Sequence, residues 1–145
     1  MTLRVGLIQT RTPASHAAAL AHVVPLVREA AAQGATFILT PEGTNILDRD
    51  RERLLPQLTL LADDPVVNGL RALAAELGVW IDVGSALVRR EDGKAANRQV
   101  LINPTGEITA TYDKLHMFDV NLPTGGTARG SATYEPGERA VIADI

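Results

Sequence analysis

The sequence predicts an α/β fold, a layered domain whose sheet mixes parallel and antiparallel strands. Two observations carry this prediction. In the first half of the chain, short apolar runs rich in valine, isoleucine and leucine alternate with longer segments of helical pattern, which is typical of strands joined by helices. Three more apolar runs then follow one another across Asp-Gly and Thr-Gly turns, which indicates antiparallel hairpins. The expected order is β-α-β-α-β-β-β.

The first three elements are a strand, a helix and a strand. Residues 3–10 form a short apolar run, and residues 12–34 form an alanine-rich segment that opens on Thr-Pro and closes on Gly34. Pro25 is expected to kink this helix or to mark where its regular part starts, because proline lacks the N–H that the preceding turn needs. Residues 35–40 form the second strand.

The second helix and the hairpins come next. Residues 63–78 carry an aspartate cap, Pro65 in the first turn, apolar residues at helical spacing and Gly78 as a stop. Further strands are expected at 79–88, 96–103 and 108–113. From 114 to 139 the pattern dissolves into a loop of a length that usually means function or disorder, and residues 140–145 start another strand.

Composition narrows the classes of protein. The 145 residues, 46% of them hydrophobic, fit one globular domain over residues 1–145 with no internal linker. A formal net charge of -3 with scattered basic residues argues against a nucleic-acid partner. Residues 1–24 lack a signal-peptide pattern and no apolar stretch reaches eighteen residues, so no membrane association is expected and the cytoplasm is the expected location.

Two charged residues stand where ligands gather in layered α/β folds. Glu42 follows the second strand and Lys114 follows the strand at 108–113, and such folds bind ligands outside the carboxyl ends of strands. An acid and a lysine there could act as a general base and as a cation for a developing oxyanion. Position alone also fits two ordinary solvated loop residues. The chain contains no cysteine, so it offers no disulfide, no Cys-based zinc site and no thiol nucleophile.

Several segments carry a family resemblance that spans nearly the whole chain: LRVGLIQT, FILTPEGTN, GSALVRREDGKAANRQVLINPTGEITATYDKLHMFDV and SATYEPGERAVIADI. In this order they resemble the amino-terminal half of a nitrilase-superfamily carbon–nitrogen hydrolase of the Nit type, which acts on ω-amides and deaminated glutathione. The resemblance implies a four-layer α-β-β-α sandwich, here truncated after about the sixth strand with the carboxy-terminal half absent. It also implies a homodimer that hydrolyses a small-molecule amide. No cofactor is expected, and no metal, because His16 and His22 are six apart on a helix and face different ways.

The resemblance also implies roles for individual residues. Glu42 matches the general base and Lys114 the oxyanion-stabilising lysine of a Glu-Lys-Cys triad. The nucleophilic cysteine of the family lies beyond this chain, so the 145 residues alone are predicted to be inactive. Ser131 is a poor replacement, because a hydroxyl needs a stronger base than a thiol. His116 and Phe118 are possible substrate-pocket residues, with packing as the alternative for both.

The segment around residue 130 departs from the family pattern. Gly130 stands where relatives have a second glutamate, and Glu135 is a weak candidate to replace it, because a glutamate before Pro-Gly is more often a turn residue. Two functions stay open. The chain is either part of an amidase completed by a complementary carboxy-terminal fragment, or a truncated, catalytically inactive domain that acts as a folding or binding partner. Both need something to cover the open sheet face.

Overall fold

The computed structural model describes residues 2–123 and 125–145. Its main sheet has five strands in sequence order: β1 (Val5–Leu7), β2 (Phe37–Thr40), β3 (Trp80–Arg89), β4 (Ala95–Ile102) and β5 (Ile108–Asp113). The first three strands run parallel, and the β3–β4 and β4–β5 pairs are antiparallel. The predicted α/β class with a mixed sheet is confirmed.

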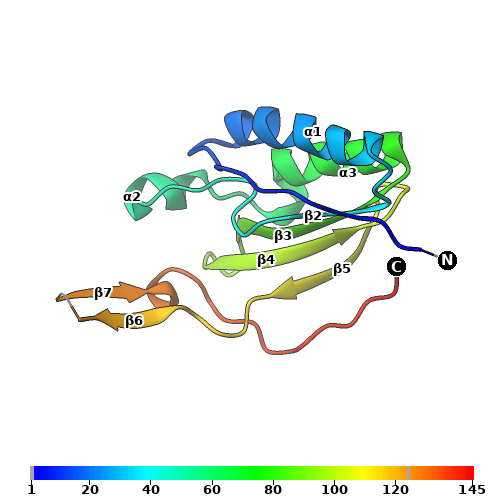
Figure 1. The fold of residues 1–145 in the computed structure, drawn as a ribbon. Helices are drawn as coiled ribbons and strands as arrows, with labels where there is room; N and C mark the ends of the chain where they lie inside the picture. The colour runs from blue at the N-terminus through cyan, green and yellow to red at the C-terminus, as the bar shows by residue number, and fades with distance from the viewer. Residues whose placement is uncertain (1, 124) are drawn as a thin grey trace.

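Two helices, α1 (His16–Ala32) and α3 (Pro65–Leu77), lie side by side over one face of this sheet (Figure 1). α3 begins and ends where its local signals predict. The Asp64 carboxylate accepts hydrogen bonds from two backbone N–H groups of the first turn, and Gly78 ends the helix with a φ of 64°, which suits a residue without a Cβ.

α1 runs through Pro25 without interruption. The helix begins at His16, so the expectation that its regular part starts at the proline is wrong. Pro25 lies on the exposed side of the helix, and so does Ala21, whose carbonyl loses its usual partner. Water can satisfy that carbonyl, which is why the helix tolerates the proline.

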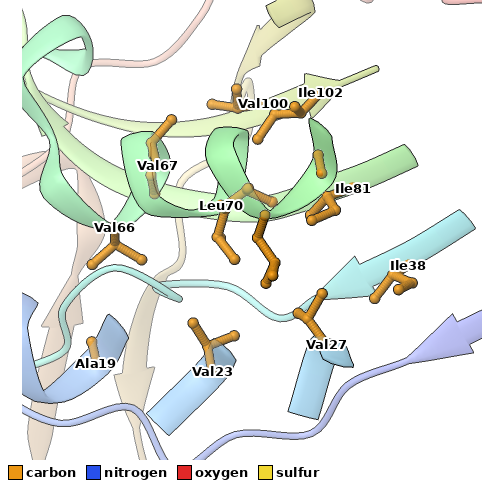
Figure 2. Close-up of a cluster of buried hydrophobic side chains, with 14 of the residues drawn as sticks. Ala19, Val23, Val27, Ile38, Val66, Val67, Leu70, Ile81, Val100 and Ile102 are labelled. Carbon is orange, nitrogen blue, oxygen red and sulfur yellow. The ribbon is translucent and has the colours of Figure 1, made fainter. Parts of the chain in front are cut away.

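The main core fills the space between the helices and the sheet (Figure 2). Val23 and Val27 from α1 and Leu70 from α3 meet Ile38 and Ile81 from the sheet, and all five are at most 1% exposed. Burying each such side chain stabilises the fold by about 2 kcal/mol. The core therefore fixes β2 and β3, the strands that lead into the candidate site.

The segment after β5 corrects two expectations. Residues 114–139 do not form one loop, because β6 (Asp119–Leu122) and β7 (Gly126–Arg129) pair as a hairpin that projects from the main sheet (Figure 1). These strands are short and rich in polar residues, so they lack the apolar alternation by which strands are predicted. Residues 140–145, expected to start a strand, have no regular structure. A strand forms when a neighbouring strand pairs with it, and the described residues provide none there.

The segment between β2 and α3 also contains structure that the sequence pattern did not reveal. A four-residue helix, α2 (Arg51–Leu54), is followed by 3-10 turns at Leu55–Gln57 and Leu61–Asp63. Such short turns contain too few residues to show a helical period.

The face of the sheet opposite α1 and α3 is not covered by any helix of the described residues (Figure 1). A hollow of about 450 Å³ opens on this face, with Asp82 and Gln99 among mainly apolar lining residues. Asp82 is 7% exposed; its Oδ2 accepts a hydrogen bond from Nε2 of Gln99 at 2.7 Å, and its Oδ1 is buried with no hydrogen-bond partner among the described residues. The open face therefore holds one acid in an environment that disfavours its charge.

Asp82→Asn is expected to stabilise the chain by about 1 kcal/mol at pH 7. Burial raises the pKa of Asp82, and the hydrogen bond from Gln99, which lowers it, offsets only part of this effect. The native acid thus stabilises the fold below the pKa of the unfolded chain, and this contribution is lost as pH rises through the raised pKa of the folded state. Urea unfolding from pH 3 to pH 7 tests this. The gain in unfolding free energy of Asp82→Asn should grow with pH. Asp144→Asn is the control and should leave the urea midpoint unchanged, because position 144 is exposed. Equal midpoints for Asp82→Asn and the native chain at pH 7 would contradict the prediction.

Candidate active site

The loop after β2 carries Glu42 and is held against β3. The N–H of Thr44 donates to the carbonyl oxygen of Ser85 at 2.7 Å, and the N–H of Ser85 donates to the carbonyl oxygen of Pro41 at 2.9 Å. These two backbone bonds bracket Glu42. The position of its backbone is therefore set by β3 as well as by β2.

β3 is irregular at the point where this loop meets it. Its pairing with β4 shifts register between Val83 and Ala86, as in a β-bulge. A Cβ added to Gly84 would lie 2.8 Å from the carbonyl oxygen of Thr40, so a side chain here would force the loop away. The glycine thus allows the end of β2 to approach β3 closely.

The carboxylate of Glu42 accepts two hydrogen bonds through one oxygen. Oε1 lies 3.0 Å from Nζ of Lys114 and 2.5 Å from Nδ2 of Asn97. The hydrogen bond from Lys114 is the largest influence on the pKa of Glu42 and lowers it; burial opposes this effect and the bond from Asn97 adds to it. Glu42 is therefore ionised at neutral pH. Its side chain is 58% exposed, so a reactant can reach it.

Lys114 is fixed through its backbone as well as its side chain. Its N–H donates to the carbonyl oxygen of Asn97 at 3.0 Å, and its carbonyl oxygen accepts from the N–H of Gly137 at the same distance. The Lys114 side chain is 35% exposed. The structure thus brings together the acid and the lysine that the sequence placed after two separate strands.

Two residues that orient the carboxylate were missed in the sequence. Asn97 is buried in β4, and its Oδ1 accepts a hydrogen bond from the hydroxyl of Ser85. The Ser85 Oγ in turn lies 3.4 Å from the donating N–H of Gly43. This chain of bonds turns the NH₂ group of Asn97 toward Glu42. The available signal was an asparagine that follows two alanines within a strand, because a buried amide needs partners.

Tyr134 is close enough to Glu42 for the carboxylate charge to act on its hydroxyl, and it was also missed. Burial raises the pKa of the Tyr134 hydroxyl, and the negative charge of Glu42 raises it further. The phenol is therefore protonated at neutral pH and is available as a hydrogen-bond donor. Its ring packs against a small apolar cluster of Ile46, Leu54, Leu58, Leu87 and Ala95.

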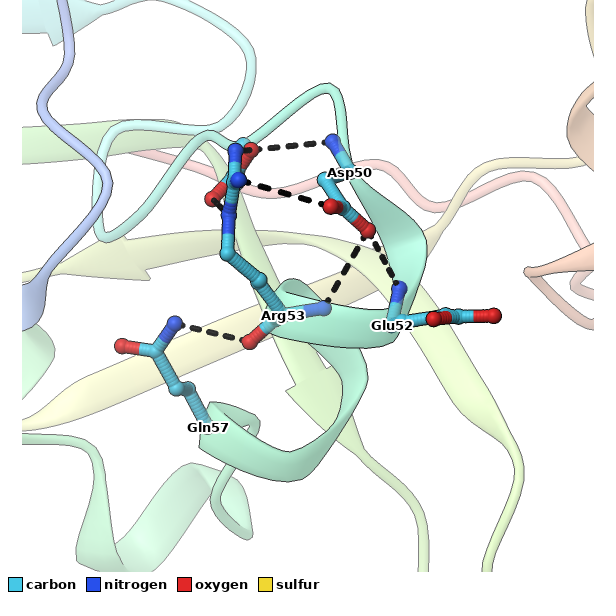
Figure 3. A network of polar contacts seen from close by, with 5 residues as sticks. Asp50, Glu52, Arg53 and Gln57 are labelled. Atoms are coloured by element: carbon cyan, nitrogen blue, oxygen red, sulfur yellow. Dashed lines mark hydrogen bonds and ion pairs between the residues drawn. The ribbon is translucent and has the colours of Figure 1, made fainter.

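The segment that leads from the site to α3 has polar contacts of its own (Figure 3). Asp50 accepts hydrogen bonds from the N–H groups of Glu52 and Arg53 at 3.0 and 3.4 Å and so caps α2. The Arg53 guanidinium donates two bonds of 2.9 Å to Asp48, and this contact is the main reason why the pKa of Asp48 falls to about 2. The short helix is thus tied to the loop that precedes it.

The two possible pocket residues lie in the stretch that follows Lys114. His116 is exposed, and the Phe118 side chain is 65% exposed. Among the contacts of the described residues, none joins either side chain to Glu42. Both stay candidates for contact with a bound substrate.

Among the described residues of the segment around residue 130, no acid contacts Lys114. Glu135 forms an ion pair of 2.9 Å with Nζ of Lys94, and no contact among the described residues joins it to Lys114. The N–H of Gly130 donates to the carbonyl oxygen of Phe118, and a Cβ at this position would lie 3.2 Å from the Phe118 nitrogen. A glutamate at position 130 would therefore require a small shift of this segment.

Ser131 has a different partner from the one a nucleophile would need. Its hydroxyl donates to Oδ2 of Asp119 at 2.6 Å, and its N–H donates to Oδ1 at 3.1 Å. The hydroxyl thus contacts Asp119 and not Glu42. The site as described combines an ionised carboxylate, which can accept a proton, with an ammonium group that can stabilise a negative oxygen.

Comparison with known proteins was made at the level of family, sequence and fold. The model of the carbon-nitrogen hydrolase family matches residues 4–144. The deaminated glutathione amidase of Yersinia enterocolitica is 34% identical over 114 residues, which are 77% of this chain and 40% of that protein. The C. elegans NitFhit crystal structure superposes with a TM-score of 0.84 at 16% identity, over 97% of this chain and 35% of that one.

A second solved structure is a Glu-to-Gln mutant of the amidase from Nesterenkonia sp. AN1. It superposes with a TM-score of 0.76 at 22% identity and covers 95% of this chain and 51% of that one; it shows the Michael addition of acrylamide at the active site cysteine of that amidase. The chain therefore spans about a third to a half of the length of these proteins. Each helix in the described part of the chain is too short or too polar to cross a membrane.

Proposed function

Because the chain belongs to the carbon-nitrogen hydrolase family, we propose that it supplies the base and the oxyanion-stabilising cation of an amidase site. Glu42 is the general base and Lys114 binds the oxyanion. The observation that carries the proposal is the position of Glu42 Oε1 between Lys114 Nζ at 3.0 Å and the amide of Asn97. The nucleophile is a cysteine outside these 145 residues, as the active site cysteine of the Nesterenkonia amidase suggests.

The proposed reaction proceeds through a thioester. Glu42 takes the thiol proton as sulfur attacks the amide carbon, and the Lys114 ammonium donates a hydrogen bond to the oxyanion that forms. The protonated Glu42 then gives its proton to the leaving amine as the carbon–nitrogen bond breaks. In the second half, Glu42 takes a proton from water, the water oxygen attacks the thioester carbon, and the thiol leaves with that proton.

The substrate in this proposal is a small-molecule amide. The Yersinia relative suggests deaminated glutathione or a related ω-amide. In this proposal the substrate contacts Tyr134, His116 and Phe118; the support is the effect of the Glu42 charge on Tyr134 and the exposure of the other two side chains.

A complementary carboxy-terminal fragment and a homodimer complete the assembly in this proposal. The support is the sheet face that no helix of the described residues covers, with Leu3, Val5 and Leu7 exposed by 57%, 44% and 76% along its β1 edge. Monomeric proteins rarely leave such surface in water. We place the assembly in the cytoplasm, where a thiol nucleophile stays reduced.

The alternative is an inactive domain that acts only as a folding or binding partner. It is favoured by the glycine at position 130. The two candidates make different predictions for a chain in which the missing nucleophile is restored.

A chimaera tests the proposal. Residues 1–145 are followed by the carboxy-terminal part of the Yersinia amidase, starting where the matched segment ends, and deaminated glutathione is added. We expect product release and an acyl adduct on the cysteine in the intact mass. Neither should occur with the 145-residue chain alone or with a chimaera whose cysteine is changed to alanine. A chimaera that unfolds cooperatively on heating yet forms no adduct would instead support the inactive partner.

A further inference from the structure

Asn45 occupies a buried position three residues beyond Glu42. It is 0% exposed, and its amide makes three hydrogen bonds. Oδ1 accepts from the N–H of Leu87 at 2.7 Å, while Nδ2 donates to the carbonyl oxygen of Leu87 at 2.8 Å and to Oδ2 of Asp64 at 2.7 Å. The side chain thus pairs with Leu87 in β3 as the backbone of a neighbouring strand would.

Asp64 connects this contact to α3. It is also 0% exposed; its Oδ1 accepts bonds of 2.9 Å from the N–H groups of Val66 and Val67, and its Oδ2 accepts from Asn45. Burial alone would raise the pKa of Asp64, but its surroundings, including His16 at 3.4 Å, lower it overall. The carboxylate is therefore ionised, and it binds the loop after β2 to the positive end of α3.

This arrangement bears on Glu42 because both hydrogen-bond partners of its carboxylate lie on other segments of the chain, so the loop must bring the side chain to them. That side chain is largely exposed, and its contacts with Lys114 and Asn97 depend on where the loop places it. The loop is tied to β3 before Asn45 by the bonds of Ser85, and at Asn45 by the bonds to Leu87. If the second tie is lost, only the bonds of Gly43 and Thr44 to Ser85 still hold this part of the loop to β3.

We propose that Asn45 and Asp64 are positioning residues that hold the Glu42 carboxylate within hydrogen-bond distance of Lys114 and Asn97. Their catalytic meaning rests on the proposed function, but their effect on Glu42 does not. The test therefore uses the 145-residue chain and measures the pKa of Glu42. Its outcome does not depend on whether the completed protein is an amidase.

The first experiment is an NMR titration of the Glu42 carboxylate in Asn45→Ala. We expect the pKa of Glu42 to rise toward its ordinary value and the amide hydrogens of residues 43 and 44 to exchange about tenfold faster. Asn103→Ala is the matched control. Asn103 accepts bonds from the N–H groups of Thr105 and Glu107 in an exposed turn, so its loss destabilises the chain without moving the Glu42 pKa. An unchanged pKa in a folded Asn45→Ala chain overturns the proposal.

A double-mutant cycle on the two side chains gives an independent readout. Asp64→Asn keeps an oxygen that can cap α3, so the chain should fold, but it places an amide opposite the NH₂ of Asn45; we expect a raised Glu42 pKa. In the double variant Asn45→Ala with Asp64→Asn, the bond between the two side chains is already lost, so the Glu42 pKa should rise little further than in the more affected single variant. Additive effects of the two substitutions would show that the pair does not act on Glu42 together.

Discussion

Glu42→Gln is expected to slow acyl-enzyme formation by about 10² to 10⁴ in a cysteine-containing form of the protein. Glutamine has nearly the same shape and can still contact Lys114 through its amide oxygen, but it cannot take the thiol proton. Rapid mixing with an amide substrate, followed by intact mass at successive times, measures the rate. Undiminished accumulation of the thioester would refute the assignment of Glu42 as the base.

Glu135→Gln is the control for this substitution, and it also tests whether Glu135 acts as a second catalytic acid. Glu135 forms an ion pair with Lys94 in the structure, so its loss should change the rate by less than about twofold, as for other exposed ion pairs. A loss comparable to that of Glu42→Gln would mean that the segment moves on completion of the fold and brings Glu135 to Lys114.

Sequence reasoning succeeded where the signals are local. Asp64 and Pro65 mark the start of α3 and Gly78 marks its end, and each acts on its own turn of the backbone. Strand ends are also local, so Glu42 and Lys114 could be placed beyond β2 and β5. These features can be predicted without knowing which residues pack against them.

It failed where a feature depends on a partner distant in sequence. Residues 140–145 have a strand-like composition, but a strand needs a neighbour, and their composition says nothing about one. Asn97 becomes part of the site because β4 pairs with both β3 and β5, which brings Ser85 to its oxygen and Glu42 to its nitrogen. Its role is a property of strand register and could not be read from the residues around it.

Lys114→Met is expected to lower the rate of thioester formation by about 10² to 10³ at pH 7 in the cysteine-containing form. Methionine preserves much of the length of the side chain and removes its charge. Lys94→Met, which breaks the exposed pair with Glu135, is the matched control and should leave the rate nearly unchanged. A native rate for Lys114→Met would exclude Lys114 from the oxyanion site.

The pH dependence separates the two ways in which Lys114 can act. Its hydrogen bond is the main reason why the pKa of Glu42 is lowered, so Lys114→Met should raise that pKa and move the acid limb of the pH–rate profile upward. The ordinary pKa of a glutamate lies well below 7. Without the lysine, burial raises the pKa of Glu42 from that value. If the rate of Lys114→Met recovers fully as pH is raised above 7, the lysine acts by keeping Glu42 ionised. If Lys114→Met stays slower than the native protein at high pH, where Glu42 is ionised in both, the lost rate reflects weaker stabilisation of the oxyanion.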